Sequence, residues 1–251
     1  MAVVLYTSNN IASKNIAEEL LKLKPTVEVI DTKATTVLDV PTDLATDYFV
    51  VLSTHKSKTA GPMITAHFPG NWDTAELGGE PRTLNIACGS RIKEFIRAAN
   101  AAAGVSWPVV LEADHHGPTP GKPIIFVEIG SSENEWQDKT AAKIVAEATA
   151  AMLRSSKQYE TVLGVGGGHY AKAFTKLVLE SDYAVGHILP KYSIDKIDYE
   201  MFQQAIKKNL EPIAKVLVLA EETNLKQKEK IRGFAERAGI AYEELKSQAA
   251  R

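Results

Sequence analysis

The sequence has very little cysteine, because Cys88 is the only one among 251 residues. A single thiol excludes an internal disulfide and a thiolate zinc cluster, and we interpret Cys88 as a small buried hydrophobic residue. Long apolar runs are also missing, since none approaches the ~20 residues that a transmembrane helix needs. The first residues, 1–6, show no pattern typical of a signal peptide. We therefore expect a cytoplasmic protein with no membrane partner.

An excess of basic charge is absent too. The 29 lysines and arginines against 31 aspartates and glutamates give a net charge of −2. Without a positive field over the whole protein we expect no DNA partner, and RNA binding would need a local basic patch. Hydrophobic residues make up 45% and charged residues 24%, as is typical of a soluble globular protein. At this length we predict one α/β domain over residues 1–251.

Short apolar runs alternate with helical periodicity along the chain. The continuous runs 48–53, 124–129 and 161–165 predict strands that are covered on both faces. The alternation predicts an α/β fold with a mostly parallel, mixed sheet that is flanked by helices. Residues 55–82 show little periodicity and contain many glycines and prolines, so we expect a long functional loop there.

Histidine is concentrated in three segments rich in glycine or proline, each of which follows or ends an apolar run: 112–118, 164–170 and 186–190. Neutral imidazole is the commonest metal ligand and a general base near pH 7. The placement therefore predicts a hydrolytic or metal-assisted site. His187 lies inside its apolar run, and we interpret it as a hydrogen-bonded core histidine.

The segment 112–118 carries the strongest local signal. Adjacent histidines in an extended chain point to opposite sides, so His115 and His116 can have different partners. Glu112 and Asp114 are candidates to orient an imidazole, and Asp114 is also a candidate ligand. His115, His116 and Asp114 would fill three positions of a catalytic zinc site and leave one for water. The spacing matches no standard zinc motif, which makes the metal interpretation weak from spacing alone.

A glycine-rich turn precedes another histidine. Gly166, Gly167 and Gly168 lead into His169 without the spacing of a dinucleotide fingerprint or a P-loop. Glycine amides before a helix can still hold a phosphate or a developing oxyanion. A tight structural turn would need only one or two glycines, so we favour a substrate-binding role for these three.

Further candidates stand at the ends of apolar runs. His55 follows the run 48–53 and is a candidate base, ligand or substrate contact, and Lys56 beside it can meet a phosphate. Lys191 follows the run 183–189 and is a second candidate phosphate contact. Glu128 lies near the end of its run and is a candidate catalytic carboxylate. Polar exits from strands and solvated lysines are the alternative interpretation of these residues.

Six motifs follow one another along the chain: Ser53-x-His55-x-Ser57, Gly70-Asn71, His115-His116-Gly117-Pro118, Glu128-Ile129-Gly130-Ser131 with Trp136, Gly166-Gly167-Gly168-His169-Tyr170-Ala171 and Gly186-His187. Together these motifs resemble the archaeal and plant type of D-aminoacyl-tRNA deacylase, over nearly the whole chain. The sequence departs from the usual family pattern at Asp114, where the family typically has threonine.

The resemblance implies hydrolysis of the ester between a D-amino acid and the terminal ribose of tRNA. It also implies a zinc requirement, a monomer, and a fold similar to bacterial peptidyl-tRNA hydrolase and nucleoside phosphorylases. On this hypothesis His115 and His116 hold or activate water, Glu128 or Glu112 orients an imidazole, and His169 contacts the ribose or the leaving oxygen.

Three other functions stay open at this point. A metal-dependent peptidase or amidohydrolase on a small molecule would use the same histidine-rich strand ends. A non-catalytic RNA-binding or phosphate-binding domain would need the glycine turn and a rim of lysines, but not the histidines. A nucleoside phosphorylase would share the fold class and would require inorganic phosphate.

Overall fold

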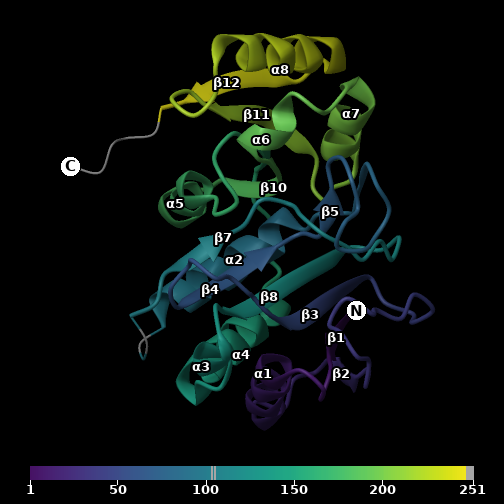
Figure 1. The fold of residues 1–251 in the computed structure, drawn as a ribbon, viewed down its shortest axis with the longest axis vertical. Helices are drawn as coiled ribbons and strands as arrows, with labels where there is room; N and C mark the ends of the chain where they lie inside the picture. The colour runs from purple at the N-terminus through teal and green to yellow at the C-terminus, as the bar shows by residue number, and fades with distance from the viewer. Residues whose placement is uncertain (103, 105, 247–251) are drawn as a thin grey trace.

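The computed structural model describes residues 1–102, 104 and 106–246, so the last residues of the predicted 1–251 domain lie outside the described part. The predicted α/β class and the parallel majority of strand pairs are confirmed. The strands divide into two main sheets, where the sequence pattern predicts one. Figure 1 shows the larger sheet in the lower half of the view and the smaller one above it.

The larger sheet has the order β2-β1-β3-β8-β4-β7, and every pair is parallel except β4 with β8. β8 is buried along its whole length and β3 is buried except at its two end residues, as expected for strands that are covered on both faces. Its strands are β1 (Ala2–Tyr6), β2 (Glu28–Asp31), β3 (Tyr48–Thr54), β4 (Met63–His67), β7 (Val109–Leu111) and β8 (Ile124–Gly130).

The smaller sheet has the order β10-β9-β11-β12 and is parallel throughout its described pairs. Two short strands form a separate antiparallel pair. The strands are β9 (Thr161–Val165), β10 (Ala184–Leu189), β11 (Ile213–Leu219) and β12 (Ala241–Leu245), with β5 (Gly70–Asn71) and β6 (Thr83–Leu84) in the short pair.

Helices cover the sheets, and one of them joins the two. α1 and α4 pack on each other and on β3 and β8. Asn10 caps the start of α1, where its side chain accepts a hydrogen bond from the Ser13 amide. α2 contacts β4 and β7 of the larger sheet and β10 of the smaller one. The helices are α1 (Ile11–Lys22), α2 (Gly89–Ala101), α3 (Glu133–Trp136), α4 (Lys139–Arg154), α5 (Lys172–Glu180), α6 (Lys191–Ile194), α7 (Tyr199–Lys207) and α8 (Leu225–Ala238).

The segment 55–82 is not one continuous loop. Residues Met63–His67 form β4, a fully buried strand in the interior of the larger sheet, and 70–71 form β5. The run is only five residues long and lies between Pro62 and Pro69, which hides it from a periodicity search. Among the described residues, no helix has the length and apolar character that crossing a membrane requires.

Candidate active site

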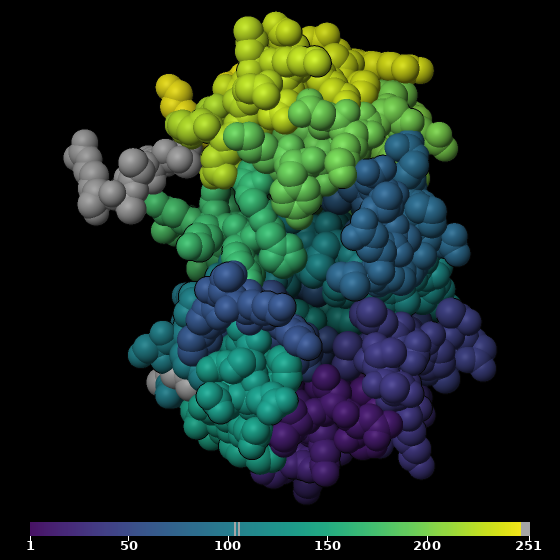
Figure 2. Space-filling view, in the orientation of Figure 1, coloured from purple at the N-terminus to yellow at the C-terminus, as the bar shows by residue number. Residues whose placement is uncertain are grey.

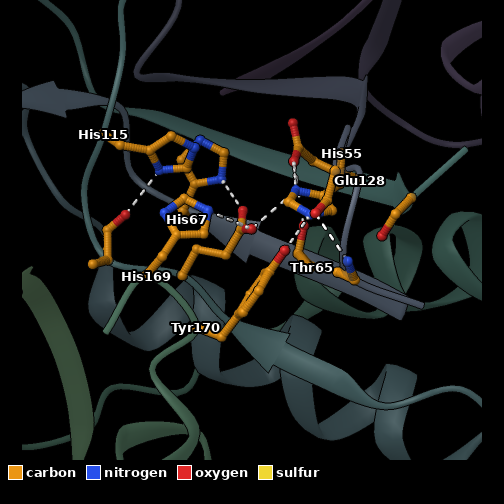
Figure 3. A network of polar contacts seen from close by, with 12 residues as sticks. His55, Thr65, His67, His115, Glu128, His169 and Tyr170 are labelled. Carbon is orange, nitrogen blue, oxygen red and sulfur yellow. Dashed lines mark hydrogen bonds and ion pairs between the residues drawn. The ribbon is translucent and has the colours of Figure 1, made fainter. Parts of the chain in front are cut away.

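A buried carboxylate is the centre of the histidine cluster. Glu112 Oε1 lies 3.0 Å from His55 Nδ1 and 3.1 Å from His169 Nε2, and both rings donate to it. Its other oxygen, Oε2, lies 3.2 Å from His67 Nδ1. Glu112 is 1% exposed and His67 is 1% exposed, whereas the side chain of His169 is 34% exposed. One carboxylate therefore orients three imidazoles. Figure 3 labels these rings, His55, His67 and His169, among the polar contacts of the cluster.

Long-range strand pairing brings these residues together. His67 ends β4, His55 follows β3, and Glu112 follows β7. Because β4 runs opposite to β8 while β3 runs along it, His67 and His55 approach from opposite ends of the sheet. The chain from Glu112 onward also pairs with the other half of the molecule, since the Ala113 amide donates to the carbonyl of His169 at 2.8 Å.

Three histidine nitrogens converge beside this carboxylate. His115 Nδ1 faces the Ala113 carbonyl at 2.9 Å, and His116 Nδ1 faces the Gly117 carbonyl. A carbonyl only accepts, so in both rings Nδ1 carries the proton and Nε2 keeps its lone pair. His67 Nδ1 faces Glu112 and is constrained in the same way. The Nε2 atoms of His67 and His116 are 3.1 Å apart.

This donor set fits a zinc ion. Nitrogen ligands at about 2.0–2.1 Å from a tetrahedral zinc lie roughly 3.3 Å from one another, close to the observed separation. His67, His115 and His116 offer three ligand atoms within 4.8 Å of one another. Within the described residues, His67 Nδ1 and Glu112 Oε2 are buried without a hydrogen bond of good alignment, although they are close. Two further groups, His55-Glu112-His169 and His67-Glu112-Glu128, have similar spacing.

The environment separates the histidines into two kinds. Burial, with the charge of His67 close by, lowers the pKa of His116 to about 3 and holds the pKa of His115 well below its usual value. Burial also opposes the charged form of His55 and His67, but the Glu112 carboxylate outweighs it, and the pKa of each is raised. Without a metal ion, the extra proton on His67 supplies the positive charge that a bound cation would otherwise supply in the cluster.

The two carboxylates also differ. Burial opposes the charge of Glu112, yet its contacts with His169, His55 and His67 hold its pKa well below the usual range. Burial raises the pKa of Glu128, and the neighbouring charge of Glu112 adds to it. Glu128 accepts from Thr65 at 3.2 Å and lies 3.8 Å from His55 Nδ1. Its place behind His55 suits a positioning residue.

An open pocket leads to the paired histidines. It has a volume of about 310 Å³ and includes His115, His116, Trp72, Leu77 and Tyr192 in its lining. His116 has a backbone φ of +48°, in the left-handed region that residues other than glycine seldom adopt. Such strain is commonly found where a site demands one side-chain direction. The pocket gives a substrate access to the otherwise buried cluster.

The structure places Asp114 away from the cluster. Its Oδ1 accepts from the Ile188 amide at 2.7 Å, and its Oδ2 is paired with His187 Nδ1. His187 is fully buried, as expected, and its Nε2 faces the Lys208 carbonyl at 2.8 Å. Asp114 belongs to none of the ligand groups found among the described residues. Its carboxylate fixes β10 to the segment 112–116.

The predicted glycine turn forms the wall of a separate pocket. Gly166 and Gly167 have φ of +108° and +78°, and the Gly166 amide already donates to the Leu189 carbonyl at 2.9 Å. Gly167, Gly168 and Lys191 line a pocket of about 580 Å³. Lys56 is exposed next to His55. The turn is therefore adjacent to the histidine cluster through His169, and not directly part of it.

Sequence reasoning missed His67 as a member of the site. His67 lies within the predicted loop 55–82, yet Phe68 and Trp72 beside it are buried at 3% and 4% exposure. The available signal was a histidine at the end of a short apolar run, the same feature that singled out His55. Tyr170 was missed as well, and its hydroxyl lies 2.8 Å from His55 Nε2.

Comparisons with known proteins show which family the chain belongs to. The family model of D-aminoacyl-tRNA deacylase matches residues 42–243. The chain belongs to the D-aminoacyl-tRNA deacylase family. The family relatives include a D-aminoacyl-tRNA deacylase of Ignicoccus hospitalis, 38% identical over 75% of this chain and 76% of the relative. Another from Thermococcus onnurineus is 31% identical over 96% of this chain and 99% of the relative.

A solved structure shares the fold of this family member. It is the crystal structure of a conserved protein of unknown function, with a TM-score of 0.90 and 26% identity, covering 97% of this chain and 95% of that chain. The family segment 42–243 includes every residue of the histidine cluster and excludes β1, α1 and β2. The cluster is thus in the part of the chain that the family shares.

Proposed function

We propose that this chain hydrolyses the ester bond of D-aminoacyl-tRNA, releasing a free D-amino acid and tRNA. The observation that carries the proposal is the set of three histidines whose ring nitrogens converge, with Nε2 of His67 and Nε2 of His116 3.1 Å apart, next to a partly exposed histidine that a buried carboxylate orients. Family membership supplies the substrate class. We expect the protein to act as a cytoplasmic monomer.

His67, His115 and His116 would hold the zinc ion. When bound, zinc would polarise the ester carbonyl or lower the pKa of a water molecule. The neutral state that burial imposes on His115 and His116 is the state that a metal ligand needs. Glu112 holds the His67 ring from the opposite side, as carboxylates behind metal-binding histidines do.

His169 is suited to move the proton. Its Nε2 donates to Glu112, which leaves Nδ1 as the basic atom, and its side chain is partly exposed beside His115 at a ring separation of 4.4 Å. His169 Nδ1 takes a proton from the attacking water while the water oxygen bonds to the ester carbon. When the ester C–O bond breaks, the same proton passes to the ribose oxygen. General acid–base catalysis of this kind contributes roughly 10²–10⁴-fold.

The test compares release of amino acid from D-Tyr-tRNA and L-Tyr-tRNA by the purified chain. We expect rapid loss of the D form, sparing of the L form, inhibition by a chelator and recovery with zinc. Zinc bound per chain, measured directly, should fall in His67→Ala and remain in His187→Gln, a second buried histidine outside the cluster. No loss of either ester at enzyme concentrations equal to the tRNA would refute the proposal. It would favour a small-molecule hydrolase instead.

A further inference from the structure

Tyr192 separates two pockets on one face of the molecule. It lines the pocket of about 310 Å³ that contains His115 and His116, and also the pocket of about 580 Å³ beside the glycine turn. Tyr192 is the second residue of α6 and is 56% exposed, so its ring is not part of the core. Figure 2 shows this face hollowed between the green part of the chain that includes α6 and the blue segment before α2.

The larger pocket lies where the smaller sheet favours a ligand. The chain passes from β9 outward to β10 and then crosses back to β11, so the loops after β9 and β11 leave the sheet in different directions. Ligands of open α/β sheets bind in the crevice at such a reversal, beyond the carboxyl ends of the strands. The loop after β9 contains Gly167 and Gly168, and the loop after β11 contains Glu221 and Glu222.

The charges of this pocket favour a base over a phosphate. Asp195, Glu221 and Glu222 line it, and among its described lining residues Lys191 is the one cation. A Cβ on Gly167 would lie 3.5 Å from the Glu222 carboxylate, so an anion at the glycine turn would meet that charge. A carboxylate accepts a hydrogen bond from the exocyclic amine of adenine or cytosine. The volume is within the ~300–1,000 Å³ typical of small-molecule sites.

The hollows continue toward two lysines of α5, of which Lys176 is also paired with Glu180. Glu222 also lines a third pocket, of about 480 Å³, which contains Lys172 and Lys176 of α5. The order along the surface is the histidine site, Tyr192, the acidic pocket and then these lysines. An aminoacyl-tRNA end presents an ester, a nucleoside and phosphates in that same order.

We propose that the 3′-terminal base of the tRNA stacks on Tyr192 and that its nucleoside occupies the pocket formed by Gly167, Gly168 and Glu222. This inference rests on the proposed function and names the part of the substrate that the site recognises. A flat aromatic ring is the surface on which proteins stack unpaired bases without regard to the rest of the sequence. The aminoacyl group then lies on the other side of Tyr192, against the histidines.

The experiment uses the full chain with Tyr192→Leu and Tyr192→Phe. Substrates are D-Tyr-tRNA, the D-tyrosyl ester of adenosine and the ethyl ester of D-tyrosine, which has no base. For Tyr192→Leu we expect kcat/KM to fall about 10-fold or more on the two substrates that carry adenosine, and to fall far less on the ethyl ester. Tyr192→Phe keeps the ring and should keep the wild-type values.

A binding measurement separates this inference from the proposed function. Uncharged acceptor-stem RNA that ends in CCA, or in CC followed by an abasic nucleotide, is titrated into the wild type and Tyr192→Leu. We expect the wild type alone to prefer the intact end. An equal loss on all three esters would place Tyr192 against the aminoacyl group and overturn the inference, and so would equal binding of the two RNAs by the wild type. If the wild type hydrolysed no ester yet preferred the intact end, only the proposed function would fail.

Discussion

The replacement Glu112→Gln tests the centre of the site, because it removes one charge with almost no change of shape. Glu112 is in contact with His55, His67 and His169 and is almost completely buried. If the glutamine oxygen takes the position of Oε1, it keeps the bonds from His55 and His169. The amide nitrogen then faces His67 Nδ1, so a donor meets a donor. Hydrogen bonds to charged groups are worth about 1.5–3 kcal/mol each, and we expect a stability loss of about 1–3 kcal/mol.

The loss should depend on pH, since the charge of Glu112 raises the pKa of His55 and His67. A histidine with a raised pKa in the folded state stabilises fully below its unfolded pKa of about 6.5, and that contribution is lost as pH rises through the folded value. The lowered pKa of Glu112 adds stability above its unfolded value of about 4.3 and loses it as pH falls further. The difference in the free energy of unfolding between wild type and Glu112→Gln should therefore be largest between about pH 4.3 and about pH 6.5, and smaller at pH 8.

Urea unfolding of the metal-free proteins at pH 6 and pH 8 measures the difference. Deacylation and zinc affinity should fall roughly 10–100-fold, as is usual when the partner of a metal-binding histidine is lost. Glu211→Gln is the matched control, because Glu211 is also buried but accepts from the amides of Gly89 and Ser90 at the start of α2. The control should lose stability and keep activity per folded molecule. Wild-type activity in Glu112→Gln, with a stability loss that is the same at both pH values, would refute the reasoning.

Three other substitutions probe the surroundings. In the wild type the pKa of folded His116, about 3, lies below its unfolded value, so stability falls as pH falls below about 6.5. His116→Asn, a residue that tolerates the positive φ, should make the stability of the metal-free protein depend less on pH between pH 7 and 5 in urea titrations. Asp114→Asn breaks a buried pair with His187 and should cost about 3–5 kcal/mol while zinc per chain is unchanged; lost zinc would make Asp114 a ligand after all. Gly130→Ala puts a Cβ 2.7 Å from the His55 side chain and should lower kcat about 10²-fold, and full activity with an unchanged Tm would contradict that contact.

Local patterns predict the elements that bury an apolar face. The run 161–165 is β9 with the same bounds, and the run 48–53 is β3 with one residue more. The pattern does not predict β12, because its sequence Ala-Tyr-Glu-Glu-Leu is at a sheet edge and half of it is exposed. It also does not predict two sheets, since the division depends on which strands pair, and that choice is made by contacts far apart in the chain.

The members of the site could be listed in large part, but not their arrangement. A histidine at the end of an apolar run marks His55 and His169, and the same rule applied to a shorter run marks His67. No local sequence pattern predicts that Glu112 contacts three histidines or that Glu128 lies behind His55. Those roles follow from the register of the strand pairs, such as the pairing of Thr65 with Glu128 in the antiparallel pair of β4 and β8.

The short stretch from Glu112 to Asp114 explains why the arrangement needs the whole fold. The Glu112 amide donates to Ala66 of the larger sheet, the Ala113 amide donates to His169, and the Asp114 amide donates to Ile188 of the smaller sheet. Three successive residues are thereby tied to both sheets. A shift of one sheet against the other would move His67 and His169 apart while Glu112 could follow only one of them. The positions of these three side chains thus depend on how the two sheets pack against each other. Substitutions at the junction of the sheets should therefore lower activity even when they are too mild to unfold the protein.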